Sequence, residues 1–270
     1  MKLKILPISD VHADGTGLRL NLERLEGADI IMVAGDVADQ YVRAGKWLTD
    51  MAEECTSKTF LFVPGNHCLG SYCTPLADVY AHYQDLSKLC PNLVTLSSGV
   101  VGPIKEHIME EAKVAFIGDT LWTDFAINGN PETSKDLAWR YLIEYGNVYQ
   151  TPHRRITPSE VQEMHHNMRA YIFERAHQLK SEGYTVVVMT HHGPHAKSQH
   201  TTAGAKYSPA YCSNVLPDEG DLSIDLWVHG HVHQFKDYQL GGTRVLHNPY
   251  CGRYGSGGAP EESWRFRMEV

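Results

Sequence analysis

Short apolar runs alternate with amphipathic stretches along the first third of the chain. Runs at residues 2–8, 29–34 and 59–63 have the length and composition of buried strands, and each gives way abruptly to polar residues. Between them, residues 18–25 and 42–54 place apolar side chains at helical spacing. This order predicts a parallel β-sheet with right-handed helical crossovers.

The same alternation continues further along the chain with one interruption. A helix at 75–89 and strands at 93–96 and 114–118 are expected, but residues 119–156 have no clear period and are rich in aromatic residues, Asn, Gly and Pro. We interpret 119–156 as an inserted cap-like loop, with a short helix around 135–145, in a single domain that spans 1–270.

The segment that follows the insertion opens with a helix start signal. Thr157 is a capping residue, Pro158 takes the first helical position and Glu160 completes a capping box, so we expect a helix to Ser181. Strands are predicted at 184–190 and 224–228, then a hairpin of 235–240 with 243–247 across Gly241-Gly242, and a tail from Asn248 with little regular structure.

Aromatic side chains are concentrated in the insertion. They are Trp122, Phe125, Trp139, Tyr141, Tyr145 and Tyr149. We favour a local hydrophobic core for them; the alternative is a lid whose rings stack on a flat leaving group.

Composition and charge restrict the class of protein. Hydrophobic residues make up 42% and charged residues 21%, as in ordinary globular proteins. A net charge of −8 disfavours long nucleic acid as a partner. The six cysteines show no C-x-x-C spacing, and no secretory signal or run near the ~20 apolar residues of a membrane span is visible. We therefore expect a cytoplasmic protein with free thiols and no membrane partner; nothing indicates a homo-oligomer.

The ends of the predicted strands carry side chains that bind metal ions. Ligands gather at the carboxyl ends of strands in parallel sheets. Seven residues occupy such positions: Asp10, His12, Asp36, Asn66, His191, His231 and His233. Nitrogen and oxygen ligands without thiolate favour borderline cations over a structural zinc–cysteine cluster. Asp10 alone could be a helix cap and Asp36 a turn residue, but the ordered set favours a metal site.

Seven ligands are too many for one tetrahedral ion, so two metal ions sharing the central Asp36 are expected. Two cations about 3.5–4 Å apart can clamp a bridging hydroxide and the oxygens of a phosphoryl group. His231 and His233 are alternate residues, which normally point to opposite faces of a strand. A tight turn at Gly230 is expected to bring both rings to one side.

These motifs resemble those of the calcineurin-like metallophosphoesterases, including uncharacterised bacterial and phage members. The resemblance rests on D-x-H at 10–12, G-D-x-x-D at 35–39, G-N-H at 65–67, the strand-end His191 and G-H-x-H at 230–233. It implies an α/β fold, a four-layer α/β/β/α sandwich of two mixed β-sheets flanked by helices. It also implies hydrolysis of small phosphomonoesters or phosphodiesters.

The resemblance implies a role for each matching residue. One metal ion would be held by Asp10, His12, Asp36 and His233, and the other by Asp36, Asn66, His191 and His231; the ions would be Mn, Fe or Zn, divalent or of mixed valence. His67 would be the general acid that protonates the leaving oxygen, and Asp39 would orient it.

The chain departs from the family pattern at two positions. Gln40 stands where the family often has an arginine that binds phosphate, which favours diesters slightly. Cys68 stands where Asp or Glu is frequent, and we assign it no mechanistic role.

Several other residues near these motifs have less specific roles. We expect His191 rather than His192 to be the ligand, and Arg244 to be structural. Four histidines are expected to face solvent, of which His195 could reach a substrate: His165, His166, His195 and His200.

Other functions remain open from the sequence. A nuclease or a cyclic-nucleotide phosphodiesterase would use the same residues, and the acidic charge argues against the nuclease. A non-catalytic metal-binding scaffold of the same fold typically lacks the histidine of G-N-H, and His67 is present here.

Overall fold

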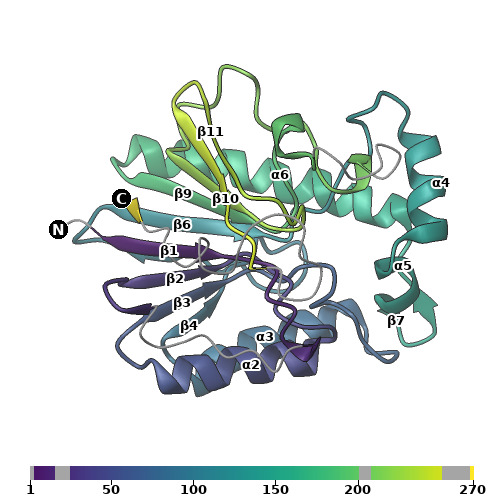
Figure 1. Cartoon of the computed structure of the whole chain (residues 1–270), viewed down its shortest axis with the longest axis horizontal. Helices are drawn as coiled ribbons and strands as arrows, with labels where there is room; N and C mark the ends of the chain where they lie inside the picture. Colours follow the sequence, from purple (N-terminus) through teal and green to yellow (C-terminus); the bar gives the residue numbers. More distant parts are fainter. Residues whose placement is uncertain (1–2, 16–24, 201–207, 251–267) are drawn as a thin grey trace.

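Two β-sheets face each other in the computed structural model, with helices on their outer sides (Figure 1). The structure describes residues 3–15, 25–200, 208–250 and 268–270. The predicted helical stretch at 18–25 falls almost entirely outside these residues, as does most of the C-terminal tail.

The first sheet is mixed and has the strand order β13-β1-β2-β3-β4. Its strands are β1 (Lys4–Ile8), β2 (Ile30–Val33), β3 (Thr59–Phe62), β4 (Leu93–Thr95) and β13 (Met268–Glu269). The four N-terminal strands are parallel, as predicted, and β13 is antiparallel to β1. The two-residue strand β13 is the regular structure that the described part of the tail contains, and it pairs with the open edge of β1.

The second sheet is also mixed, with the order β11-β12-β10-β9-β6-β5. Its strands are β5 (His107–Met109), β6 (Val114–Asp119), β9 (Thr185–Thr190), β10 (Leu226–His229), β11 (Lys236–Leu240) and β12 (Thr243–His247). The hairpin of β11 and β12 is confirmed. Strand β5 was not predicted because it has only three residues, all half-buried, and so shows no apolar run.

Alternating side chains along the central strands build the layers. In β2, Ile30 and Met32 pack between the two sheets, whereas Ile31 and Val33 pack against helices α2 (Tyr41–Glu54) and α3 (Leu76–Leu89). Strands buried on both faces read as continuous apolar runs, as this one does.

The second sheet is covered in the same way on its outer side. Val187 and Met189 of β9 face the first sheet, and Val186 and Val188 pack with Ile172 of helix α6 (Pro158–Ser181). The order helix, sheet, sheet, helix is the predicted α/β/β/α sandwich, which is thus confirmed.

The segment 119–156 contains more regular structure than predicted. It forms α4 (Pro131–Tyr141), α5 (Glu144–Asn147) and a small hairpin of β7 (Tyr149–Thr151) with β8 (Arg154–Arg155), at the right of Figure 1. The predicted helix at 135–145 starts earlier, because the side chain of Asn130 caps α4, and it ends at Tyr141.

The aromatic residues of this segment divide into two groups. Trp122, Phe125 and Tyr145 are buried in the core beneath the helices, as favoured, whereas Trp139 and Tyr141 are exposed. A local core therefore accounts for only part of the set.

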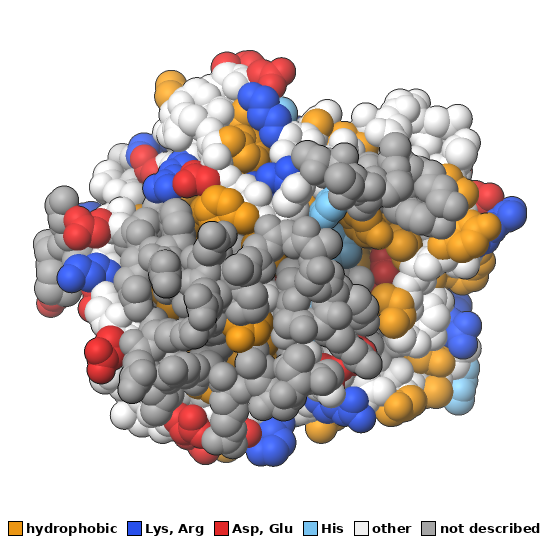
Figure 2. Space-filling model, viewed as in Figure 1, with side chains coloured by type: hydrophobic (Ala, Val, Ile, Leu, Met, Phe, Trp, Pro, Cys, Tyr) orange, Lys and Arg blue, Asp and Glu red, His pale blue; other side chains and the backbone are white. Residues whose placement is uncertain are grey.

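In the described part of the chain, no helix combines the length and the apolar composition needed to cross a lipid bilayer. Lys and Arg side chains are interspersed with Asp and Glu around the described part of the face in Figure 2. That part of the face has no continuous basic surface.

The capping box at the start of α6 generates a stability prediction. Thr157 Oγ1 accepts a hydrogen bond from the Glu160 backbone N–H at 3.3 Å, and the Glu160 carboxylate accepts one from the Thr157 N–H at 2.9 Å. Thr157→Ala removes the cap, so we expect a loss of about 1 kcal/mol and a fall of roughly 2–4 °C in the thermal unfolding midpoint. Ser159→Ala, in the same exposed turn, is the matched control; an equal shift in both variants would contradict the capping role.

Candidate metal centre

The strand ends that carry the predicted ligands converge at one edge of the two sheets. Backbone hydrogen bonds join the loops directly: Asp10 N–H donates to Gly35 O at 3.0 Å and His12 N–H to Asp36 O at 3.0 Å. Gly230 N–H donates to His191 O at 2.9 Å. The loops after β1 and β2 are thus joined to each other, and so are those after β9 and β10.

Most of the predicted ligands have an unusual backbone conformation. Positive φ values, which L-residues rarely adopt, occur at five of the seven: Asp10 (52°), His12 (46°), Asp36 (50°), His231 (73°) and His233 (57°). Each costs on the order of 1–3 kcal/mol and persists only where the surrounding structure enforces it, typically at functional sites. The left-handed turns aim these side chains into one cluster.

Gly230 and Gly65 lie where the loops pass too close to one another for a side chain. The G-H-x-H turn is made by His231 and His233 rather than by Gly230, contrary to expectation, because Gly230 does not have positive φ. A Cβ at Gly230 would lie 2.3 Å from the Ala34 carbonyl oxygen, and one at Gly65 would lie 2.2 Å from Asp36 Oδ1. Only glycine allows these backbones to approach so closely.

One group of candidate ligands consists of Asp10, His12 and His233, whose ligand atoms all lie within 4.8 Å of one another. His233 Nε2 is 3.3 Å from Asp10 Oδ1 and 3.3 Å from His12 Nε2. Asp10 is fully buried, and its carboxylate accepts the His231 backbone N–H at 3.0 and 3.1 Å. This contact links the first group to the second.

The second group consists of Asp36, His191 and His231, again within 4.8 Å of one another, with Asn66 beside them. His191 Nε2 lies 3.2 Å from Asp36 Oδ2, 3.0 Å from Asn66 Oδ1 and 3.2 Å from His231 Nδ1. The other ring nitrogen of His191 contacts the carbonyl oxygen of Ala34 at 2.9 Å, which fixes the ring. The structure therefore brings together all seven predicted ligands in two adjoining groups.

His67 lies at the edge of both groups and is paired with Asp39. His67 Nδ1 is 2.7 Å from Asp39 Oδ1, and the His67 backbone N–H donates to Asp36 Oδ1 at 3.0 Å. Burial by itself would lower the pKa of His67, but the carboxylates of Asp36 and Asp39 raise it to about 9. The contact expected between His67 and Asp39 is present.

The buried carboxylates are held in the charged form by the histidines around them. Burial tends to raise the pKa of Asp36, yet attraction to His191 and His67 brings it below its ordinary value. Burial likewise acts to raise the pKa of Asp10, and His233 lowers it. The centre is therefore a place where negative charge is kept away from water next to imidazole nitrogens.

Two buried atoms test whether metal ions suit this centre. Asp36 Oδ2 and His231 Nε2 have no hydrogen-bond partner among the described residues. Buried polar atoms are nearly always hydrogen-bonded, so a carboxylate oxygen that makes no hydrogen bond among converging imidazoles is suited to a bound cation. The set of neutral nitrogen donors and carboxylate or amide oxygens fits Mn, Fe or Zn.

Two residues of the centre were missed from the sequence. Glu144 of α5 is buried, and its carboxylate accepts a hydrogen bond from Asn66 Nδ2 at 3.3 Å. His247, at the end of β12, places Nε2 3.3 Å from Asp10 Oδ2. His247 could have been found because it too ends a strand, whereas Glu144 lies in the aperiodic insertion and gave no signal.

Expectations for the remaining histidines were partly wrong. His192 is buried and stacks on His231 with 4.4 Å between ring centroids. His165 and His195 are also buried rather than solvent-facing: His165 Nδ1 contacts Leu121 O at 3.0 Å, and His195 pairs with Asp218 at 3.4 Å. His166 is exposed as expected, and His200 is half-buried.

The structure gives structural roles to Cys68 and Arg244. Cys68 is fully buried, and its sulfur accepts the Val37 backbone N–H at 3.3 Å. Burial raises the pKa of this thiol to about 12, so it stays protonated and unreactive. Arg244 pairs with Asp237 at 2.7 Å, as expected for a structural residue.

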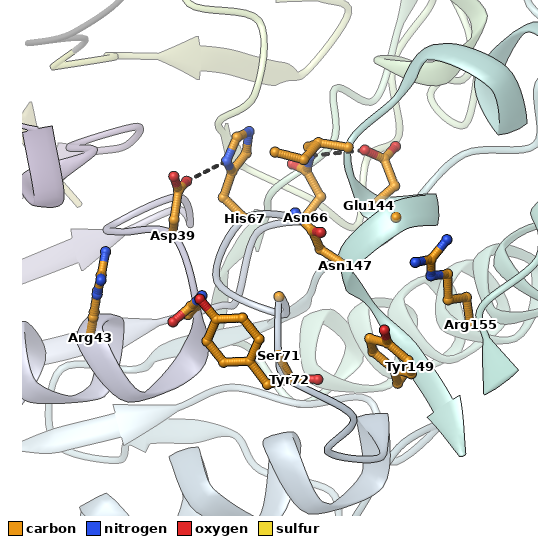
Figure 3. Close-up of a pocket in the computed structure, with 14 residues that line it drawn as sticks. Asp39, Arg43, Asn66, His67, Ser71, Tyr72, Glu144, Asn147, Tyr149 and Arg155 are labelled. Atoms are coloured by element: carbon orange, nitrogen blue, oxygen red, sulfur yellow. Dashed lines mark hydrogen bonds and ion pairs between the residues drawn. The ribbon is translucent and has the colours of Figure 1, made fainter. Parts of the chain in front are cut away.

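A pocket of about 420 Å³ opens beside His67 (Figure 3). One wall comes from Asp39 and the start of α2, another from the loop 66–72, and the third from the segment 143–155. The predicted insertion thus contributes a wall next to the candidate centre.

Comparison with known proteins agrees with this arrangement. The sequence profile of the calcineurin-like phosphoesterases matches residues 3–235. An uncharacterised protein, L509, of Acanthamoeba polyphaga mimivirus is 22% identical over 229 residues, which cover 81% of this chain and 76% of that protein.

Solved structures share the fold. Phosphopantetheinyl hydrolase from Mycobacterium tuberculosis superposes with a TM-score of 0.68 at 18% identity, covering 100% of this chain and 96% of the other. A dimetal phosphatase from Danio rerio gives a TM-score of 0.51 at 14% identity, covering 91% and 86%. From its profile match over most of its length, this chain belongs to the calcineurin-like phosphoesterase family.

Proposed function

We propose that this protein is a dinuclear metal-dependent hydrolase of small phosphoesters. The observation that carries the proposal is the pair of adjoining ligand groups, Asp10-His12-His233 and Asp36-His191-His231, beside a His67–Asp39 pair. Asn66 is assigned to the second group, and Asp36 is the proposed ligand shared by both metal ions. When bound, two cations of the Mn, Fe or Zn type would lower the pKa of water and neutralise charge on the phosphoryl oxygens.

His67 is the proposed proton donor. Its Nδ1 is engaged by Asp39, which leaves Nε2 to protonate the leaving oxygen. Asp39 fixes the ring orientation and stabilises the imidazolium form, so we assign it as a positioning residue.

Glu144 is a second proposed positioning residue. An asparagine amide can point its oxygen or its NH₂ group at a metal ion, and only the oxygen is a ligand. Glu144 accepts from Asn66 Nδ2, and this directs Asn66 Oδ1 toward His191 and the second group. The segment 119–156 thereby supports the centre as well as the pocket.

The substrate is proposed to be a small phosphomonoester or phosphodiester. Gln40 lines the pocket beside His67 and offers no guanidinium to the reacting phosphate, so the slight preference for diesters stays a prediction. Phosphopantetheinyl hydrolase and a dimetal phosphatase among the similar structures agree with phosphoester hydrolysis. The acidic net charge of −8 disfavours the nuclease alternative, and His67 disfavours the non-catalytic scaffold.

The first test is hydrolysis of phenyl phosphate, whose leaving oxygen needs a proton, by protein stripped of metal and then supplied with Mn²⁺. We expect activity only after the metal is added. His67→Ala should then lower kcat by ~10²–10⁴-fold, the usual contribution of a general acid, while Mn²⁺ binding measured by calorimetry persists. His166→Ala, an exposed histidine on α6, serves as the control. Unchanged turnover in His67→Ala would remove this residue from the assigned role.

The second test concerns Glu144. Glu144→Ala frees the Asn66 amide to rotate, so we expect Mn²⁺ affinity to fall about 10–100-fold, as for other residues that orient metal ligands. Glu144→Gln keeps an acceptor oxygen and should restore most of the affinity. Calorimetric titration of the metal-free variants measures both; equal affinity in wild type and Glu144→Ala would contradict the positioning role.

A further inference from the structure

The pocket beside His67 contains two arginines that pair with no carboxylate among the described residues. Arg43, on the first turn of α2, and Arg155, on β8, both line it and are both exposed (Figure 3). Neither makes an ion pair or a side-chain hydrogen bond with any residue that the structure describes.

The other described arginines all have partners. Four pair with carboxylates and one lies over an aromatic ring: Arg140 with Asp136, Arg154 with Glu160, Arg175 with Glu106, Arg244 with Asp237, and Arg169 over Phe173. In a chain of net charge −8, this pocket places two guanidinium groups beside two carboxylates, those of Asp39 and Glu144. Arginine is suited to phosphate and carboxylate groups, which it can bind through two parallel hydrogen bonds.

The carboxylates that line the same pocket do not cancel this charge. Asp39 is hydrogen-bonded to His67, and Glu144 is hydrogen-bonded to Asn66. Arg43 and Arg155 stand at opposite sides of the opening, so an anion that enters between them is attracted from both (Figure 3).

Two tyrosines complete the surroundings of the arginines. Tyr149 pairs with Arg155 across the β7–β8 hairpin, and Tyr72 is 82% exposed on the loop that follows His67. Their hydroxyl groups can donate hydrogen bonds to an anion in the pocket. The pocket therefore offers positive charge and donors beside the candidate metal centre, from which Asn66 also reaches its lining.

We propose that this pocket binds the leaving group of the substrate, and that the leaving group carries a further anionic group, a phosphate or a carboxylate, bound by Arg43 and Arg155. This rests on the proposed function, because His67 would stand between the phosphorus atom and the pocket. In the step itself, water loses one proton to solvent as its oxygen bonds to phosphorus, and the bond from phosphorus to the leaving oxygen breaks. That oxygen takes a proton from His67, which regains one from solvent. The released product, with its own anionic group, lies beside the two arginines.

Matched pairs of substrates test the proposal with Mn²⁺-supplied protein. Adenosine 3′,5′-bisphosphate is compared with adenosine 5′-monophosphate for release of the 5′-phosphate, and 3-phosphoglycerate with glycerol 3-phosphate. We expect kcat/KM to favour the more anionic member of a pair by about tenfold, the effect of one hydrogen-bonded charge pair. The first pair reports on a phosphate and the second on a carboxylate.

The arginine variants decide whether the pocket is responsible. Arg43→Gln and Arg155→Gln should each reduce that preference, and the double variant should abolish it. Arg140→Gln on α4 and Lys46→Gln one turn along α2 remove charges that are paired with Asp136 and Asp50, and both should keep the preference. A wild-type protein without preference, or a double variant that retains it, overturns the proposal.

A binding measurement separates this proposal from the proposed function. Calorimetric titration of metal-free protein with adenosine 3′,5′-bisphosphate should give a Kd about tenfold weaker in either arginine variant than in the wild type. If binding depends on the arginines while no phosphoester is hydrolysed with Mn²⁺, the proposed function fails and the pocket assignment holds. If phosphoesters are hydrolysed but binding ignores the arginines, the pocket assignment fails alone.

Discussion

The rest of the centre depends on the contacts that stabilise the buried carboxylate of Asp36. An isolated charge in this position would be very unfavourable, because little water reaches it. Two contacts offset this cost. The His67 backbone N–H donates a hydrogen bond to Asp36 Oδ1, and His191 Nε2 lies 3.2 Å from Asp36 Oδ2. Position 65 has to be glycine, because a Cβ there would collide with this carboxylate.

The centre is also a product of the contact between the two sheets. Asp10, Asp36 and Asn66 follow strands of the first sheet, whereas His191, His231 and His233 follow strands of the second. Each ligand group contains residues from both sheets. The apolar layer between the sheets, which includes Met32 and Met189, therefore sets the distance across which the ligands meet.

Most strands could be predicted from the sequence because the central ones are buried on both faces and read as apolar runs, whereas the sandwich of two sheets followed from the family resemblance. Polar residues at the strand ends were visible for the same reason, and this identified Asp36 and His231. Sequence reasoning failed where position is set by tertiary contacts alone. The strand β13 exists only because β1 has an open edge, and His165 and His195 are buried by segments distant in the chain. Glu144 and Arg155 lie in a stretch without hydrophobic periodicity, so the local sequence gave no sign that they line the pocket beside His67.

The hydrogen bond between Asn66 and Glu144 has a consequence for how this chain can change over time. Coupling between two sites is reciprocal, so a shift of α5 that weakens this bond must alter the second ligand group, and a disturbance of that group must loosen α5. Surface insertions usually diverge freely because few contacts hold them. Here one buried carboxylate ties the segment 119–156 to Asn66, so we expect substitutions to be tolerated better around Glu144 than at it.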